Sequence, residues 1–216
     1  MADHCQGVDI YHGQGNVDFG RLKAAGVEFV IPKASQGTYM DPNEVSYVDQ
    51  ARAAGLIVPA VYVWVAPNDT PEFVTLFLAQ LKQRGDLAVM LDVETTGVAG
   101  DEAIAAYGKV VDMYMDMSEQ ALGRCGFRYT GKWPVAFVSE RQKKWPQVLA
   151  GYHALGNGPS IPFWDGVEGV EDWTTRVAIW QYSGNGHVDG CDTPIDLDES
   201  AVPAERLANF GRTGVF

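Results

Sequence analysis

The run LAVMLDVE at residues 87–94 decides the fold class that we expect for this chain. It is apolar except for two acidic residues near its end. A continuous apolar run of this length is typical of a strand that is buried on both faces, as the strands of a parallel sheet are. Parallel strands need long crossover connections, and the residues from Asp101 to Leu122 carry the apolar spacing of a helix. The run therefore predicts one β/α unit of a parallel sheet.

Similar units extend from this run toward both ends of the chain. The sequence predicts strands at residues 7–11, 27–33, 56–65, 134–139 and 177–183, and helices at residues 17–25, 43–54 and 141–149. A further helix is expected from Thr70, which suits an N-cap, and Pro71, which suits the first turn. After residue 150 we expect a turn at Gly184-Asn185-Gly186 and a short extended piece at residues 195–198, without helices between the strands. This order favours a single β/α barrel, similar to a TIM barrel, whose last strands lack crossover helices, over an open doubly wound sheet.

Length and composition agree with one α/β domain. We expect it to span residues 1–216, with a core over residues 5–200 and a C-terminal capping segment over residues 201–216. The 16 Lys and Arg residues against 28 Asp and Glu residues give a net charge of −12, which argues against nucleic acid and anionic membranes as partners. No stretch reaches the roughly 18 apolar residues of a membrane span. The N-terminus also lacks the pattern of a secretory signal, so we expect folding in a cytoplasm.

The cysteines and histidines indicate neither a disulfide framework nor a metal site. The three cysteines are Cys5, Cys125 and Cys191, and no two have CxxC spacing, so we expect free thiols. The four histidines form no HExxH pattern. The acids at Asp192, Asp196 and Asp198 lack the register of a calcium loop, and solvated charge is the favoured interpretation. We expect neither a metal nor a cofactor.

Acidic residues stand near the ends of otherwise apolar strands. They are Asp9, Asp92, Glu94 and Asp196. In a β/α barrel the active site lies where the parallel strands end. Asp92 and Glu94 are two residues apart, so on a strand both side chains point to the same face and one pKa is raised. A protonated carboxyl beside an ionised one is the pair of catalytic groups that typically cleaves a glycosidic bond. The alternative is that the pair caps a helix or joins a salt-bridge network.

Aromatic residues accompany these acids. They include Tyr62, Trp64, Trp164, Trp173, Trp180 and Tyr182. Aromatic rings stack on the apolar faces of sugars, and polar groups beside them fix the hydroxyls. For each aromatic taken alone, a place in the core is the favoured reading. Several of them at strand ends beside carboxylates favour a saccharide cleft.

Five segments in order resemble the glycoside hydrolase family 25 muramidases, also called Chalaropsis-type lysozymes. They are GVDIYHGQG from residue 7, VEFVIPKASQGTYMDP from residue 27, MLDVE from residue 90, AIWQYS from residue 178 and PIDLD from residue 194. The chain departs from the family pattern at Tyr11, where serine is usual, and at Gly13, where an aromatic residue is frequent. The family's A-Y-H-F segment is Val61-Tyr62-Val63-Trp64 here.

The resemblance implies a flattened β/α barrel and hydrolysis of the β-1,4 bond between N-acetylmuramic acid and N-acetylglucosamine in peptidoglycan. Glu94 would be the general acid, and Asp9, Asp92 and Asp196 would be the other acids of the site. Substrate contacts are expected from Lys33, Gln36, Tyr62, Trp64, Trp180, Gln181 and Tyr182. The second carboxylate could act as a nucleophile, could activate water, or could orient the substrate's own acetamido group, which is the expected route because Asp92 lies on the same face as Glu94.

Two other functions stay open at this point. The barrel could bind peptidoglycan without cleaving it, or could cleave another N-acetylated glycan such as chitin, although the chitinase-like D-x-x-D-x-D-x-E strand is absent. Many members of the family are bacteriophage endolysins. We therefore expect a monomeric lysin without a separate cell-wall-binding domain, held in the host cytoplasm until a holin opens the membrane.

Overall fold

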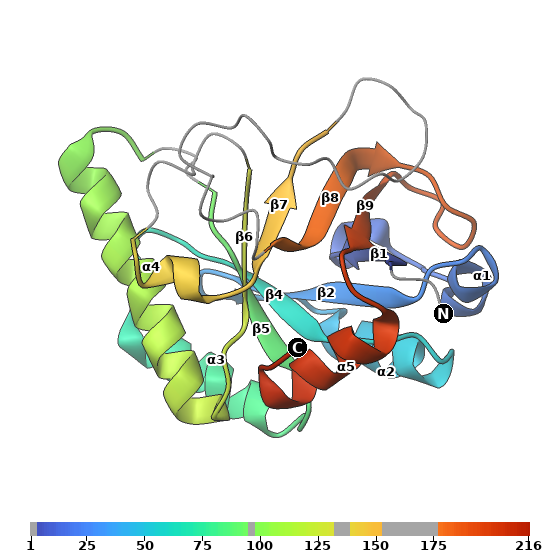
Figure 1. Ribbon diagram of the computed structural model, residues 1–216, viewed down its shortest axis with the longest axis horizontal. Coiled ribbons are helices and arrows are strands. Elements are labelled where there is room, and N and C mark those ends of the chain that lie inside the picture. Colours follow the sequence, from blue (N-terminus) through green and yellow to red (C-terminus); the bar gives the residue numbers. More distant parts are fainter. Residues whose placement is uncertain (1–3, 95–97, 132–138, 153–176) are drawn as a thin grey trace.

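The computed structural model describes residues 4–94, 98–131, 139–152 and 177–216. Eight strands close into a barrel, and helices lie around it (Figure 1). The strands of the barrel are β1 (Cys5–Ile10), β2 (Phe29–Gln36), β4 (Ala60–Trp64), β5 (Ala88–Asp92), β6 (Phe127–Gly131), β7 (Gln147–Ala150), β8 (Val177–Gly186) and β9 (Ile195–Ser200). A short strand β3 (Tyr39–Met40) forms a hairpin with β2.

The direction of the strands confirms the expected fold class. The strands β1, β2, β4, β5, β6, β7 and β8 are successively parallel. The last strand, β9, is antiparallel to both of its neighbours, β8 and β1, and closes the barrel between them. The closing strand therefore follows β8 without a crossover helix, as the sequence predicts.

The helices are α1 (Phe19–Ala24), α2 (Glu44–Ala53), α3 (Pro71–Lys82), α4 (Asp101–Leu122) and α5 (Ala204–Thr213), with 3-10 turns η1 (His12–Gln14) and η3 (Gln142–Lys144). The Thr70 hydroxyl accepts a hydrogen bond from the backbone N–H of Phe73 and caps α3, as expected. Even α4, at 22 residues, lacks the apolar stretch needed to cross a bilayer, and so do the other helices of the described ranges.

Two apolar clusters hold the strands in place because the side chains of a strand alternate between its faces. Val61 and Val63 of β4 point outward into a cluster with Phe77 of α3 and Tyr114 of α4. Tyr62 points into the barrel, whose interior cluster is covered by α5. Helix α5 crosses the ends where β4 and β5 begin, since a Cβ on Gly211 would lie 2.6 Å from the carbonyl oxygen of Pro59. The other end of the barrel is the end where the parallel strands finish.

Two local predictions need correction. Residues 141–149 are not a helix: one 3-10 turn, η3, ends before Pro146, whose carbonyl accepts from the N–H of Arg128, and β7 follows. Proline lacks the N–H that a continuing helix requires. Gly184-Asn185-Gly186 belongs to β8 rather than to a turn, and the register shifts there absorb the extra residues.

The strand expected at residues 134–139 stays a prediction, because residues 134–138 lie outside the described residues. The structure shows β6 at Phe127–Gly131, which the sequence analysis missed. Trp164 and Trp173 also lie outside the described residues. The three cysteines are free thiols, as expected.

Helix α5 provides a test of the barrel's interior packing. Phe210 is 1% exposed, and its ring centroid lies 4.3 Å from that of Phe127. We expect Phe210→Ala to lower the free energy of unfolding by about 3–5 kcal/mol, because truncation leaves a cavity between α5 and the strands. Urea unfolding measures the change. Leu76→Ala on the outer face of α3, where Leu76 is 66% exposed, is the control, with an expected change within about 0.5 kcal/mol. Equal effects of the two substitutions would contradict this packing.

Candidate active site

The four acids singled out by the sequence lie together at the end of the barrel where the parallel strands finish. Asp9 is near the end of β1, Asp92 is the last residue of β5, and Glu94 follows two residues later. Asp196 is at the start of β9, which is antiparallel, so it lies at the same end and directly opposite Asp9. All four acids line one pocket of about 80 Å³, together with Tyr62, Met90, Tyr129 and Gln181.

Burial dominates the electrostatics of Asp92. It is 9% exposed, and its Oδ1 atom is buried without a hydrogen-bond partner among the described residues. Burial raises the pKa of Asp92 well above its usual value; the charge of Glu94 raises it further, and Lys33 opposes the shift. The sequence predicted that one carboxyl of the pair would have a raised pKa, and the structure places that raised pKa on Asp92.

Asp9 and Asp196 form the second half of the cluster. Burial raises the pKa of Asp9 well above its usual value, and the charges of Asp198 and Asp196 add to the shift. The pKa of Asp196 is also raised by burial, while a side-chain hydrogen bond to Asp9 opposes this. Both pKa shifts favour protonated carboxyls, so the opposed pair carries less negative charge than two ionised carboxylates would.

Gln181, which lies on β8, holds the side chain of Asp9 in place. Its Nε2 atom donates to Oδ2 of Asp9 at 2.6 Å, and its Oε1 atom accepts from the hydroxyls of Tyr129 at 2.9 Å and Tyr152 at 2.8 Å. Because the two phenols bind the oxygen of the amide, the nitrogen must face Asp9. Burial raises the pKa of Tyr152 to about 12, so this phenol stays a neutral donor.

Tyr129 and Tyr152 were not predicted from the sequence. Tyr129 lies on β6, opposite Asp92 in the strand register. Strand β6 has the sequence FRYTG, in which a buried arginine and a buried threonine interrupt the apolar pattern. The alternation of Phe127 and Tyr129 on one face is the signal that could have identified it.

The other predicted contacts divide between two places. Lys33 is half-buried near the acids: its Nζ atom lies 5.6 Å from the ring centroid of Tyr62 and donates to Oε1 of Gln36 at 2.8 Å. Trp180 and Tyr182 alternate with Gln181 along β8 and therefore point to the opposite face of the strand. There the indole N–H of Trp180 donates to the carbonyl oxygen of Gly151.

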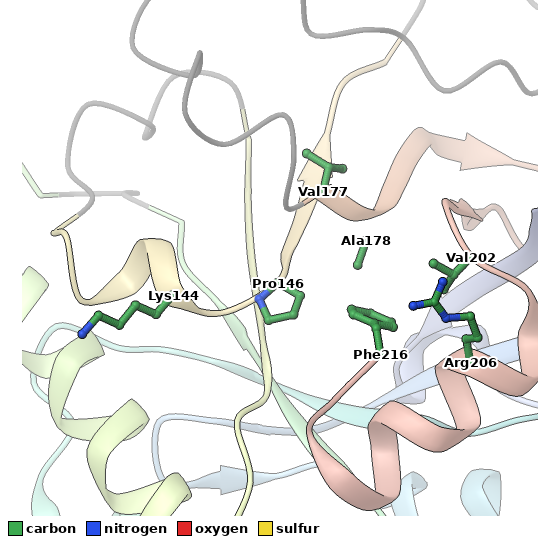
Figure 2. A pocket seen from close by; sticks show the side chains of 7 residues that line it. All are labelled: Lys144, Pro146, Val177, Ala178, Val202, Arg206 and Phe216. Carbon is green, nitrogen blue, oxygen red and sulfur yellow. The ribbon is translucent and has the colours of Figure 1, made fainter.

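A larger cavity, of about 300 Å³, lies at the opposite end of the barrel, near the starts of β7 and β8 (Figure 2). The seven side chains that line it are mainly apolar, with Lys144 on one side and Arg206 on the other, and none is a carboxylate. Acid–base chemistry needs titratable groups within reach of one another, so the smaller acidic pocket is the candidate active site. In the described part of the chain, no group of three or more His, Cys, Asp or Glu side chains could hold a metal ion.

Below the acidic pocket, Asp198 lies opposite Gly7 of β1 and Gln181 of β8. It is 1% exposed, and burial, followed by the charge of Asp196, raises its pKa well above the usual value. A raised pKa means that the folded state holds this proton more tightly than the unfolded state. The resulting stabilisation is complete below the unfolded pKa of about 3.9 and is lost as the pH rises through the folded pKa.

The raised pKa of Asp198 leads to a prediction for the variant Asp198→Asn. The amide cannot ionise, so the variant should gain stability relative to the wild type as the pH rises from 5 to 8. Urea unfolding at both pH values measures the free energy of unfolding of each protein. A change in the free energy of unfolding that the amide causes equally at both pH values cancels when the two pH values are compared. The same difference between variant and wild type at both pH values would show that Asp198 is not the buried acid described here.

Comparisons with known proteins agree with this geometry. The family model of glycosyl hydrolases family 25 matches residues 8–191. The autolytic lysozyme of Clostridium acetobutylicum is 31% identical over 196 residues, which are 90% of this chain and 55% of that protein. The chain therefore spans about half the length of that relative.

Solved structures show the same fold. A bacterial lysozyme from Streptomyces coelicolor superimposes with a TM-score of 0.73 at 21% identity, covering 98% of each chain. The catalytic domain of the endolysin ply40 from bacteriophage P40 of Listeria monocytogenes gives a TM-score of 0.64 at 17% identity, covering 99% of each chain. With the family model matched from the first strand of the barrel to Cys191, just before its last, this chain belongs to the glycosyl hydrolases family 25.

Proposed function

We propose that this chain is a muramidase that hydrolyses the β-1,4 bond between N-acetylmuramic acid and N-acetylglucosamine in the glycan strands of peptidoglycan. The observation that carries the proposal is the single pocket into which four carboxyl groups from β1, β9 and the end of β5 converge. Membership of a glycosyl hydrolase family and the similarity to an autolytic lysozyme support this substrate.

In this proposal Glu94 is the general acid. It stands just beyond the end of β5, is half-buried, and lines the pocket with Asp92. Its carboxyl donates a proton to the glycosidic oxygen as the bond from that oxygen to the sugar carbon breaks. The same group then removes a proton from the water that completes hydrolysis.

Asp92 orients the acetamido group of the substrate. Its buried Oδ1 atom has no hydrogen-bond partner among the described residues, so it can accept the acetamido N–H. Burial favours the protonated form of Asp92 in the free protein, but the bound acetamido N–H favours its ionised form, so in the complex the proton of the Asp92–Glu94 pair lies on Glu94. The acetamido oxygen then attacks the anomeric carbon, and the carboxylate of Asp92 stabilises the positive charge that develops on the ring formed. Water opens this ring, and the configuration of the sugar is retained.

Asp9 and Asp196 complete the acidic pocket in the same proposal. Their raised pKa values favour protonated carboxyls, so the two groups can lie opposite each other without full repulsion, and Gln181 keeps Asp9 in place. Lys33 and Tyr62 flank the acids, so they are the proposed contacts for the sugar next to the cleaved bond.

We further propose that the chain is a monomeric bacteriophage lysin that is released to the cell wall from the host cytoplasm by a holin. The support is the similarity to the phage endolysin domain and the net charge of −12, which gives no attraction to anionic membranes.

Glu94→Gln tests the assignment of the general acid. The amide cannot donate the proton, so the release of reducing sugar ends from purified peptidoglycan should fall by about 10² or more. Glu140→Gln is the matched control, because Glu140 is exposed and forms only a surface ion pair with Lys143 among the described contacts. If the Glu94 variant releases reducing ends as fast as the wild type and the control do, Glu94 is not the general acid.

A further inference from the structure

The cavity of about 300 Å³ at the far end of the barrel has no part in the proposed function (Figure 2). It lies where β7 and β8 begin and where the chain passes from β9 into α5. We call it the Arg206 cavity; the described residues that line it are Lys144, Pro146, Val177, Ala178, Val202, Arg206 and Phe216. Ligand sites in proteins usually measure about 300–1,000 Å³, so this volume suits one small molecule.

The walls of the cavity are apolar because the protein already pairs the backbone groups around them. The carbonyl oxygen of Pro146 accepts from the N–H of Arg128 at 3.0 Å. The carbonyl oxygen of Ala178 accepts from the N–H of Ala201 at 2.8 Å, and both backbone polar groups of Val202 are hydrogen-bonded as well. A ligand therefore meets mainly the side chains of proline, alanine, valine and phenylalanine, which favour an apolar body.

The ring of Phe216 forms a fixed wall of the cavity. It stacks on the ring of Phe210, which is fully buried, with the two ring centroids 4.6 Å apart. Cζ of Arg206 lies 6.0 Å from the centroid of the Phe216 ring, which is within the range of a cation–π contact. The ring therefore helps to hold the guanidinium group beside the cavity, and a preformed site of this kind needs little reorganisation when a ligand binds.

Arg206 supplies the positive charge of the cavity. Figure 2 shows its guanidinium group turned toward the centre of the cavity, whereas Nζ of Lys144 points away from the other side chains of the lining. None of the ion pairs between described residues includes Arg206, although acidic residues outnumber basic ones by 28 to 16. The N–H groups of this guanidinium are the charged donors that a ligand in the cavity meets.

One cation beside apolar walls selects the chemistry of the ligand. A guanidinium group binds a carboxylate through two parallel N–H···O bonds. A phosphate group carries a charge of about −1.5 to −2 at neutral pH, which a single guanidinium does not balance. A peptide would bring backbone amides against walls whose own polar groups are already paired, and unpaired amides raise the free energy. The lining therefore fits a molecule with one carboxylate and an apolar body.

We infer that the Arg206 cavity binds a monocarboxylate with an aliphatic tail, of the class of medium-chain fatty acids. The carboxylate lies on the guanidinium group of Arg206, and the tail lies between the ring of Phe216 and the first residues of β8. This site goes beyond the proposed function and does not depend on it. A ligand that binds only the folded state also stabilises the protein.

Isothermal calorimetry with sodium octanoate, kept below the concentration at which it forms micelles, tests the site. We expect saturable binding of one molecule per chain. Hexanoate should bind about fifteenfold more weakly than octanoate, because each buried methylene group tightens binding about fourfold. The uncharged 1-octanol should bind about tenfold more weakly than octanoate, because it lacks the carboxylate that Arg206 binds.

Arg206→Gln tests the role of the charge. We expect it to weaken the binding of octanoate about tenfold and to leave the binding of 1-octanol unchanged, because the glutamine side chain is uncharged. Arg212→Gln is the matched control, since Arg212 is also exposed on α5 but does not line the cavity. Val202→Phe places a ring in the cavity and should abolish the binding of both octanoate and 1-octanol.

The side chain of Arg206 is exposed, so its variant decides the question even if Val202→Phe does not fold. The site is wrong if octanoate shows no saturable binding to the wild type, or if Arg206→Gln binds octanoate as tightly as the wild type does. An equal loss of affinity in Arg206→Gln and Arg212→Gln would also overturn it, because the attraction would then be general rather than a contact in this cavity.

Discussion

Asp9 and Asp196 lie directly opposite each other where the first and last strands of the barrel pair. Like charges in opposite positions of an antiparallel pair destabilise a sheet. Here the pairing also closes the barrel, because β9 joins β8 to β1. The raised pKa values of both acids favour protonated carboxyls, which weakens the repulsion, and the amide of Gln181 donates a hydrogen bond to Asp9. The strand pairing that closes the barrel therefore also brings Asp9 and Asp196 together in the acidic pocket.

The rest of the structure offsets the free-energy cost of placing Asp9 and Asp196 opposite each other. The buried acids Asp92 and Asp198 add carboxyls that the folded state holds protonated more readily than the unfolded state does. Apolar packing on both faces of the strands supplies the opposing stabilisation, with the α1–α4 side chains outside and α5 across the interior. Because these acids are buried at one end of the barrel, the perturbed pKa values are concentrated there, as they commonly are in active sites.

The sequence predicted the strand that ends at Asp92, two residues before Glu94, because an apolar run ending in two acids is a local pattern. Asp9 and Asp196 could be identified as site residues from the strand ends and from the family resemblance. Their position directly opposite each other, however, depends on the register between β1 and β9, which lie near the two ends of the chain. No local pattern sets that register. Tyr129 was missed for a related reason: β6 carries buried polar residues whose place is decided by neighbouring strands.

The prediction of a helix at residues 141–149 was wrong because Pro146 lacks the backbone N–H that a helix needs, and the residues after it form β7. A hollow of about 320 Å³ between the β2–β3 turn and the loop that joins β4 to α3 could not be predicted from the sequence either, although Trp64 and Gln36 in its lining were both expected contacts. Its shape depends on the β2–β3 turn meeting a loop some thirty residues later, which Gly37 and Asp69 bring together. Residue types therefore indicated the chemistry, and non-local pairing decided the geometry.

The most direct measurement of the central claim is a crystal structure of the Glu94→Gln variant with an uncleaved glycan fragment of alternating N-acetylglucosamine and N-acetylmuramic acid. This account predicts a glycosidic oxygen within hydrogen-bonding distance of the side chain at position 94 and an acetamido N–H on Asp92. A fragment bound at the other end of the barrel, or one whose glycosidic bonds all lie away from the acidic pocket, would contradict it.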